Sequence, residues 1–260
     1  MKPAAFDYER PDRLDDALGL LAAEGARVLA GGQSLGPMLN LRLAQPALLV
    51  DITRIAELRA AERVNGSLVL GACVTHAAIE DGQVPDATNG ALASVAGGIA
   101  YRAVRNRGTV GGSLAHADPA ADWVTCLSAL GAEAVIAGAD GERRVPVAGF
   151  VSGAFETALR PGELLRGVSV PALSAGAKWG YYKFCRKAGD FAEAIGAVLS
   201  DGDATRTVLG ATSGAPIVIE GAYSDEAVRA ALPAEMDAYD RQVHFVAAKR
   251  AAMIAGVRAA

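Results

Sequence analysis

The chain has 260 residues, a formal net charge of −4 and a hydrophobic content of 52%. This length is enough for two or three subdomains. The lack of a basic excess argues against a nucleic-acid partner. The sequence has no apolar signal region at its start and no run of about 18 apolar residues, so no transmembrane segment is expected.

Three cysteines lie far apart in the sequence, at Cys73, Cys126 and Cys185. Their odd number and the lack of a Cys-x-x-Cys pair argue against a disulfide framework, a zinc site or an iron–sulfur cluster in this chain. The three histidines also lack metal-ligand spacing. We therefore expect a cytoplasmic protein that holds no metal of its own.

The first 57 residues predict a small α/β unit. Apolar residues from Leu14 to Leu21 have helical spacing, with Asp12 at the start and Gly25 at the end. Strands are expected at residues 27–30 and 48–51. We expect these elements to present the loop that follows the first strand.

That loop lies within Val28-Leu29-Ala30-Gly31-Gly32-Gln33-Ser34-Leu35 and is called here the first glycine bend. Two adjacent glycines allow positive φ and a close approach of the backbone to a ligand. Successive N–H groups in such a turn point into one concavity and favour an anion. A glycine pair of this kind is also a common structural turn.

Residues 58–175 predict a second unit of mixed helix and strand. Hairpin turns are expected at Asn65-Gly66 and Asp140-Gly141, and Thr75 can cap a short helix. A small-residue helix is predicted over residues 91–100, and a strand over residues 164–170. Asp118, followed by Pro119, is expected to be the N-cap of a further helix.

The same unit contains Thr109-Val110-Gly111-Gly112-Ser113, called here the second glycine bend. It has the same character as the first bend, with a glycine pair flanked by small hydroxyl side chains. Together the two bends predict one diphosphate held from two sides. Replacing Gly32 or Gly111 with Val is expected to expel the ligand and leave the fold largely intact.

Residues 176–260 predict a third unit, separated from the second near residues 171–176. Three antiparallel strands are expected at residues 179–187, 192–199 and 205–210. Two helices follow, near residues 225–232 and 241–257. The apolar face of the second helix is expected to consist of Val243, Val246, Ala247, Met253, Ile254 and Val257.

Standard nucleotide and hydrolase motifs are missing from the sequence. No Gly-x-x-x-x-Gly-Lys-[Ser/Thr] or Gly-x-Gly-x-x-Gly pattern is present, which argues against a P-loop and a Rossmann site. No serine lies in a Gly-x-Ser-x-Gly elbow. The sequence thus gives no support to a hydrolase.

Four motifs in a fixed order carry a family resemblance. They are Ala30 to Leu35, Arg105-Asn106-Arg107-Gly108 running into Thr109 to Ser113, His116-Ala117-Asp118-Pro119-Ala120-Ala121-Asp122, and Arg186-Lys187-Ala188-Gly189-Asp190-Phe191. Over nearly its whole length the chain resembles the FAD-binding medium subunit of molybdenum hydroxylases, the carbon monoxide dehydrogenase and xanthine dehydrogenase family.

The resemblance implies an α+β fold. Residues 1–57 and 58–175 would form a two-lobed FAD-binding domain of the PCMH or vanillyl-alcohol-oxidase type. Residues 176–260 would form a small domain like the C-terminal domain of the carbon monoxide dehydrogenase flavoprotein, with a three-stranded antiparallel sheet and helices. The region after Gly210 is shorter than usual in the family.

The resemblance also implies the FAD site. Both glycine bends would donate N–H groups to the pyrophosphate, with hydroxyls from Ser34, Thr109 and Ser113. Asp122 would bind ribose or ribityl hydroxyls, and Leu164 would pack near the flavin ring. The complete expected set is Val28, Leu29, Ala30, Gly31, Gly32, Gln33, Ser34, Leu35, Ile99, Ala100, Thr109, Val110, Gly111, Gly112, Ser113, Asp122, Leu164, Lys183, Lys187 and Phe191.

Lys183, Lys187 and Phe191 would lie on a strand pair that faces the isoalloxazine, where a cation can stabilise the reduced flavin. Which lysine lies nearer the ring is left open. Phe191 stands where carbon monoxide dehydrogenase relatives often carry Tyr, so a phenolic hydrogen bond is missing. No catalytic acid or base is assigned, and His116 and Asp118 are expected to cap a helix and shape a loop.

The function implied is electron transfer in a multi-subunit enzyme. A large molybdopterin subunit would hydroxylate the substrate, a small subunit would carry iron–sulfur clusters, and this chain would pass electrons through FAD to an external acceptor. A dimer of such heterotrimers is expected. The alternatives are a free-standing flavoenzyme acting on a small substrate and a nonenzymatic nucleotide-binding module.

Overall fold

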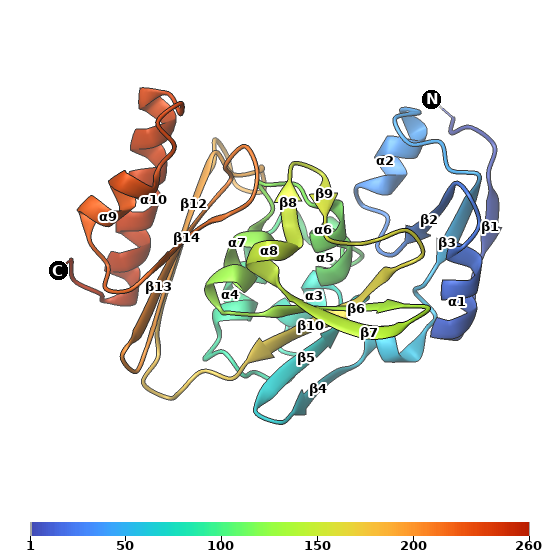
Figure 1. Cartoon of the computed structure of the whole chain (residues 1–260), viewed down its shortest axis with the longest axis horizontal. Helices are drawn as coiled ribbons and strands as arrows, with labels where there is room; N and C mark the ends of the chain where they lie inside the picture. Colours follow the sequence, from blue (N-terminus) through green and yellow to red (C-terminus); the bar gives the residue numbers. More distant parts are fainter. Residues whose placement is uncertain (1, 260) are drawn as a thin grey trace.

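The computed structural model describes residues 2–259. Three sheets follow one another along the longest axis of the molecule, from the N-terminal unit to the C-terminal helix α10 (Figure 1). Each sheet draws its strands from one of the three predicted segments, although the domain boundaries themselves stay a prediction. Among residues 2–259, no helix combines the length and apolar character needed to cross a bilayer.

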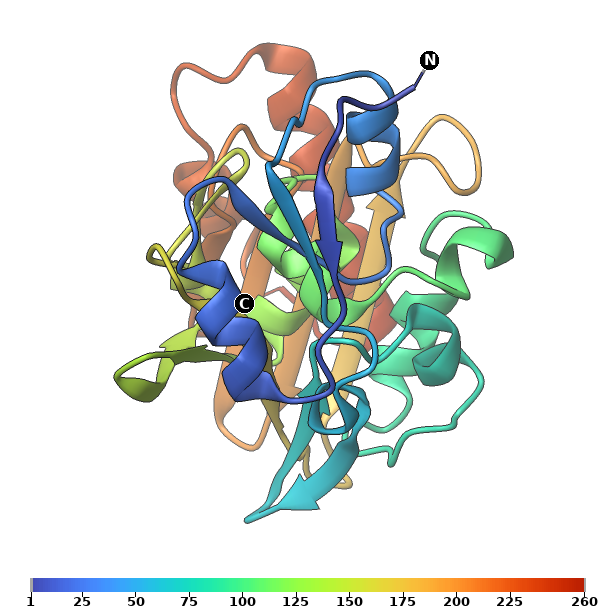
Figure 2. The same ribbon diagram turned by 90° about the vertical axis from the view of Figure 1, so that its right-hand side faces the viewer.

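The N-terminal unit is a parallel three-stranded sheet. Its order is β1 (Asp7–Glu9), β3 (Leu48–Asp51) and β2 (Ala26–Leu29). Helices α1 (Leu14–Leu21) and α2 (Leu35–Asn40) accompany it. Figure 2 looks onto this unit, whose blue strands stand in front of the rest of the molecule.

The predicted start of α1 needs a correction. The N-cap residue is Arg13, whose side chain makes no capping hydrogen bond, and Asp12 lies one residue too early to cap. Asp15 and Asp16 in the first turn still favour the positive end of the helix dipole. Ala17, together with Val50 and Ile52, packs in the core of this unit.

The central sheet is antiparallel and has five strands. Their order is β4 (Ala61–Val64), β5 (Ser67–Gly71), β10 (Leu164–Pro171), β6 (Glu133–Gly138) and β7 (Gly141–Pro146). Both predicted hairpins are present, although the second turns at Ala139-Asp140, one residue before the predicted Asp140-Gly141 pair. Asn65 and Gly66 have φ of 50° and 80°, as a two-residue type I′ turn requires.

Short helices surround the central sheet: η1 (Ala56–Arg59), α3 (His76–Glu80), α4 (Ala91–Gly97), α5 (Arg102–Arg105), α6 (Val110–His116), α7 (Asp122–Ala129) and α8 (Val147–Phe150). A small two-stranded sheet, β8 (Val151–Gly153) with β9 (Glu156–Thr157), follows α8. As predicted, Thr75 caps α3, since its hydroxyl oxygen accepts from the Ala78 N–H.

The predicted N-cap at Asp118 is wrong. Helix α7 begins at Asp122, with Ala121 as its N-cap residue. The Asp118 carboxylate instead accepts a hydrogen bond from the Ala120 N–H at 2.9 Å, within the turn that precedes the helix. The local signal was real, but it marks an Asx turn and not a helix start.

The C-terminal sheet is antiparallel in the order β11 (Lys178–Phe184), β12 (Ala194–Asp201), β13 (Ala204–Gly210) and β14 (Ile217–Glu220). The three predicted strands are confirmed, and the prediction missed the fourth. Helices α9 (Asp225–Ala231) and α10 (Ala238–Ala255) follow β14. Helix α10 covers the outer face of this sheet, while α7 packs against β12 and β13 on the inner face (Figure 1).

The predicted apolar face of α10 is only partly correct, since Ala247 is buried and Val246 and Val257 pack against the core, but two other predicted members do not. Met253 and Ile254 are 71% and 59% exposed, and the buried residues are chiefly alanines and Phe245. A Cβ on Gly180 would lie 1.9 Å from the Ala251 carbonyl oxygen, and one on Gly196 would lie 2.5 Å from that of Ala247. The helix therefore lies directly on sheet glycines, and only small side chains fit between them.

Candidate functional site

The two glycine bends touch each other. A Cβ added to Gly31 would lie 2.1 Å from the Arg107 carbonyl oxygen and 2.9 Å from Gly108 Cα. A Cβ on Gly112 would lie 3.7 Å from Ala30 Cβ. The N-terminal and central units are thus in backbone contact at these bends, and Gly31 is required there because any side chain would push them apart.

A cavity of about 530 Å³ lies beside this contact. All of the predicted site residues line it except Leu29, Val110 and Lys187. Leu29 is the last residue of β2, Val110 is fully buried in the core, and the Lys187 side chain is 72% exposed. The volume lies within the range of cofactor pockets, roughly 300–1,000 Å³.

The first bend leaves its backbone donors free. Within residues 2–259, the N–H groups of residues 31–35 donate to no protein acceptor. Gly32 has a φ of 70°, and the Gln33 side chain donates to the Gly31 carbonyl oxygen at 3.2 Å. A run of free N–H groups next to a left-handed residue at a cavity wall has the donors that an anion needs.

The second bend does not match the prediction in this respect. The Val110 and Gly111 N–H groups donate to the Val74 and Ala72 carbonyl oxygens, both at 3.0 Å. The next two N–H groups, of Gly112 and Ser113, donate to the Thr109 hydroxyl and carbonyl oxygens. These four N–H groups are therefore used within the protein, and the bend offers a ligand its hydroxyl side chains instead.

Gly111 has a structural role in this bend. A Cβ there would lie 2.4 Å from Ala72 Cβ and 2.6 Å from Ala72 Cα. The glycine lets the start of α6 lie against the chain that follows β5. A side chain at this position would disturb the protein itself, before any ligand is considered.

Asp122 connects the central unit to the C-terminal sheet at one wall of the cavity. Its carboxylate, 6% exposed, accepts from the Tyr181 hydroxyl at 2.8 Å and pairs with Lys183 Nζ at 2.9 Å. Burial, and then the charge of Asp122, raises the pKa of Tyr181 well above its usual value. The phenol therefore stays a hydrogen-bond donor at neutral pH.

Only one of the two candidate lysines lines the cavity. Lys183 belongs to β11, lines the cavity and has a side chain that is only 12% exposed. Lys187 and Phe191 lie on the loop between β11 and β12 and not on the strands themselves, which corrects the prediction. Phe191 lines the cavity although it is 65% exposed.

Prediction from the sequence missed His76 as a cavity residue. It is 4% exposed and lines the cavity, and its Nδ1 accepts from the Trp123 indole N–H at 3.0 Å. Because indole only donates, the ring proton of the neutral imidazole lies on Nε2. Burial, helped by the Arg105 charge, lowers the pKa of His76 to about 4. The lone histidine gave no sequence signal of this role.

His116 also lines the cavity, but it does not cap a helix as predicted. It is the last residue of α6, and its ring packs against Phe155 with a centroid separation of 5.2 Å. The role predicted for Asp118, shaping the loop, is confirmed by its hydrogen bond to Ala120.

The turn at residues 160–163 was missed as well. It lines the cavity, and Glu163 holds it by accepting from the Arg160 N–H at 2.8 Å. Arg143 donates two hydrogen bonds to the Glu163 carboxylate, which lowers the pKa of Glu163 to about 2. The Pro161-Gly162 pair in the sequence is a turn signal that could have found this segment.

The comparisons with known proteins show the family of this chain. The family model for the FAD binding domain in molybdopterin dehydrogenase matches residues 4–173, which include both glycine bends and most of the cavity wall. The chain belongs to this family. It is an FAD-binding oxidoreductase subunit, and its fold is that of the molybdopterin dehydrogenase flavoproteins.

Relatives in this molybdopterin dehydrogenase family cover nearly the full chain. Subunit alpha of the 6-hydroxypseudooxynicotine dehydrogenase complex of Paenarthrobacter nicotinovorans is 37% identical over 98% of this chain and 92% of its own length. The carbon monoxide dehydrogenase medium chain of Hydrogenophaga pseudoflava is 38% identical over 90% of this chain and 87% of its own.

Solved structures show the same relationship. Carbon monoxide dehydrogenase from Hydrogenophaga pseudoflava superposes with a TM-score of 0.89 at 36% identity, covering 100% of both chains. Quinoline 2-oxidoreductase from Pseudomonas putida 86 gives 0.86 at 32% identity, covering 98% of each. These similarities favour the FAD subunit of a multi-subunit molybdenum hydroxylase over a free-standing flavoenzyme.

Proposed function

We propose that this chain binds FAD with its diphosphate at the first glycine bend. The observation that carries the proposal is the run of free N–H groups at residues 31–35, which open onto a cavity of suitable size. Ser34, Thr109 and Ser113 add hydroxyl donors from the two bends. Neutral donors of this kind can hold a diphosphate without a lysine.

The isoalloxazine is placed at the cavity end formed by Asp122, Lys183, Phe191 and the Ile99–Ala100 turn. The Lys183 ammonium can stabilise negative charge on a reduced ring there, and its ion pair with Asp122 fixes its position. Leu164 is assigned to the adenosine half, in place of the expected ring contact. It packs with Val50 and Ile52 of the N-terminal unit.

This chain is further proposed to work beside a small iron–sulfur subunit and a large molybdopterin subunit, in a cytoplasmic dimer of heterotrimers. Bound FAD supplies both hydride and one-electron chemistry. The chain's own residues bind and orient it and set its charge environment. Substrate hydroxylation is assigned to the large molybdopterin subunit.

The test is the absorbance spectrum of the full chain, followed by purification from its native host. We expect flavin bands and two associated chains. A colourless protein that binds ADP but not FAD would favour a nonenzymatic module. Reduction of bound flavin by a small organic substrate, with this chain alone, would instead establish a free-standing flavoenzyme.

A further inference from the structure

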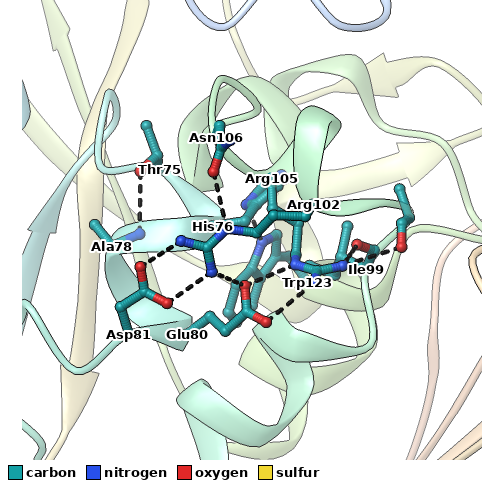
Figure 3. Close-up of polar contacts among 11 residues, drawn as sticks. Thr75, His76, Ala78, Glu80, Asp81, Ile99, Arg102, Arg105, Asn106 and Trp123 are labelled. Carbon is teal, nitrogen blue, oxygen red and sulfur yellow. Dashed lines mark hydrogen bonds and ion pairs between the residues drawn. The ribbon is translucent and has the colours of Figure 1, made fainter.

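Four charged side chains form a cluster of hydrogen bonds and ion pairs (Figure 3). Glu80, the last residue of α3, and Asp81 face Arg102 and Arg105 of α5. Arg102 pairs with Asp81 at 2.5 Å and with Glu80 at 2.8 Å, and Arg105 pairs with Glu80 at 2.7 Å. The cluster joins two short helices that have few other ties to each other.

Arg105 differs from Arg102 in what else it reaches. Its Nε and one terminal nitrogen hold both oxygens of Glu80, at 2.7 and 3.0 Å. Its other terminal nitrogen donates to the carbonyl oxygens of Ile99 and Ala100, at 2.9 and 3.1 Å. The Arg105 side chain is only 13% exposed, whereas that of Arg102 is 48% exposed.

The turn that Arg105 holds has an uncommon backbone conformation. Ala100 has a φ of 43°, which L residues other than glycine rarely adopt and which costs about 1 kcal/mol or more. Ile99 and Ala100 both line the cavity. Two charge-assisted hydrogen bonds to their carbonyl groups are a sufficient reason for the turn to keep this shape.

The loop of residues 185–193 rests on the same turn. A Cβ on Gly189 would lie 3.2 Å from the Ala100 carbonyl oxygen and 3.0 Å from the ring of Tyr101. This loop carries Phe191 to the cavity. A shift of Ala100 would therefore press on Gly189, two residues before Phe191 in the same loop.

We propose that Arg105 is a positioning residue for the flavin end of the cavity. Anchored by Glu80, it fixes the Ile99–Ala100 turn and, through Gly189, the loop that carries Phe191. The inference rests on the proposed placement of the isoalloxazine and adds to it the element that sets the shape of that end. The proposed role of Arg105 concerns neither the diphosphate site nor the adenosine half of the cavity.

The chain offers a matched control in Arg102. It lies on the same helix, pairs with the same Glu80, and donates to Asn106, but it makes no hydrogen bond to the turn among residues 2–259. Arg105→Gln and Arg102→Gln remove the same charge from the same cluster. Only the first should release the turn. Arg105→Lys serves as a milder variant, since a lysine cannot reproduce the guanidinium fork.

The experiment measures the affinity of the full chain for FAD and for ADP, together with tryptic cleavage without ligand. Arg186 and Lys187 have side chains that are 86% and 72% exposed, so cleavage there reports on the loop. For Arg105→Gln we expect at least tenfold weaker FAD binding, unchanged ADP binding and severalfold faster cleavage after these residues. For Arg102→Gln we expect changes below twofold.

Two results would overturn the proposal: equal effects of the two glutamine variants, or equal weakening of FAD and ADP binding by Arg105→Gln. If that variant does not fold, Arg105→Lys must show the same pattern to a smaller degree. A wild-type chain that binds no FAD would refute the proposed function. The cleavage rates would still test whether Arg105 holds the turn and loop.

Discussion

The two glycine bends have nearly the same sequence character but use their backbone N–H groups differently. In the first, Gly32 adopts a φ of 70° and the N–H groups of residues 31–35 have no acceptor within the described chain. In the second, the N–H groups of residues 110–113 are all bonded within the protein. Both bends bring chain segments together, but only the first leaves its backbone donors free for the proposed ligand.

The difference shows that a glycine pair can meet two separate needs. One need is a left-handed backbone, which exposes donors. The other is the absence of a Cβ, which permits contact at Gly31 with Arg107 and at Gly111 with Ala72. The sequence shows only that glycines are present. The segment that packs against each glycine determines whether its left-handed backbone or its missing Cβ is required.

The largest expected effect is at the second bend. Gly111→Ala places a Cβ 2.4 Å from Ala72 Cβ and 2.6 Å from Ala72 Cα, where no flexible side chain can give way. We expect a loss of about 3 kcal/mol in the free energy of unfolding, measured with urea. Gly111→Val should leave little folded protein, contrary to the expectation that the fold would survive it.

The control for this substitution is Gly36→Ala on α2, where a Cβ would meet nothing within 4 Å. We expect it to change the free energy of unfolding by less than about 1 kcal/mol. Equal stability of the Gly111 and Gly36 variants would show that the second bend is not a packing element.

The next largest effect is the pH dependence of stability caused by His76, which contacts the residue just before the second bend. His76 donates its backbone N–H to the Gly108 carbonyl oxygen at 2.9 Å, and its ring lies 2.9 Å from where a Gly108 Cβ would be. Its pKa of about 4 in the folded chain is below the ordinary value of 6.5. The unfolded chain therefore binds the proton first as the pH falls from about 6.5 towards about 4.

The stability that neutral His76 contributes is present above pH 6.5 and is lost as the pH falls towards 4. Between pH 7 and 4.5 this loss is about 2 kcal/mol. Urea unfolding of the wild type and of His76→Gln at pH 7 and pH 4.5 gives the change in the free energy of unfolding of each protein. The difference between the two changes is the contribution of His76. Identical dependences would mean that His76 titrates normally in the folded chain.

The two bends show which structural features can be predicted from the sequence alone. The elements that depend on local signals, such as the Asn65-Gly66 hairpin, the Thr75 cap and the strand at residues 48–51, are confirmed. So is the family. These features depend on turn chemistry and on residues close together in the chain.

Apart from the local error at Asp118, the main errors came from contacts between distant segments. The Ala72 and Val74 carbonyl oxygens accept the N–H groups of Gly111 and Val110. No residue near Gly111 in the sequence predicts these hydrogen bonds. Gly180 and Gly196 select an alanine face of α10 from more than 50 residues away. Likewise, Asp122 distinguishes Lys183 from Lys187 only once β11 lies beside α7.

At the first bend we expect the reverse of the result at Gly111. A Cβ on Gly32 would meet only Leu29 Cδ1, at 3.4 Å, so Gly32→Ala is strained by its φ of 70° and not by packing. It should cost about 1 kcal/mol of stability but weaken FAD binding at least tenfold, because it alters the path of the N–H groups. Titration with FAD beside Gly36→Ala tests this, and full affinity would rule out the first bend as the diphosphate site.

The smallest effect separates the hydroxyls of the second bend from its backbone. Ser113 lines the cavity, and within the described residues its hydroxyl makes no hydrogen bond, whereas the Thr109 hydroxyl caps α6 by accepting from Gly112. Ser113→Ala should therefore weaken FAD binding about threefold to tenfold, as expected for one hydrogen bond, and leave the unfolding midpoint unchanged. Thr109→Val should lower both the affinity for FAD and the unfolding midpoint, since it also removes the helix cap. If Ser113→Ala bound FAD normally, the second bend would act through packing alone, and the diphosphate would be held from one side.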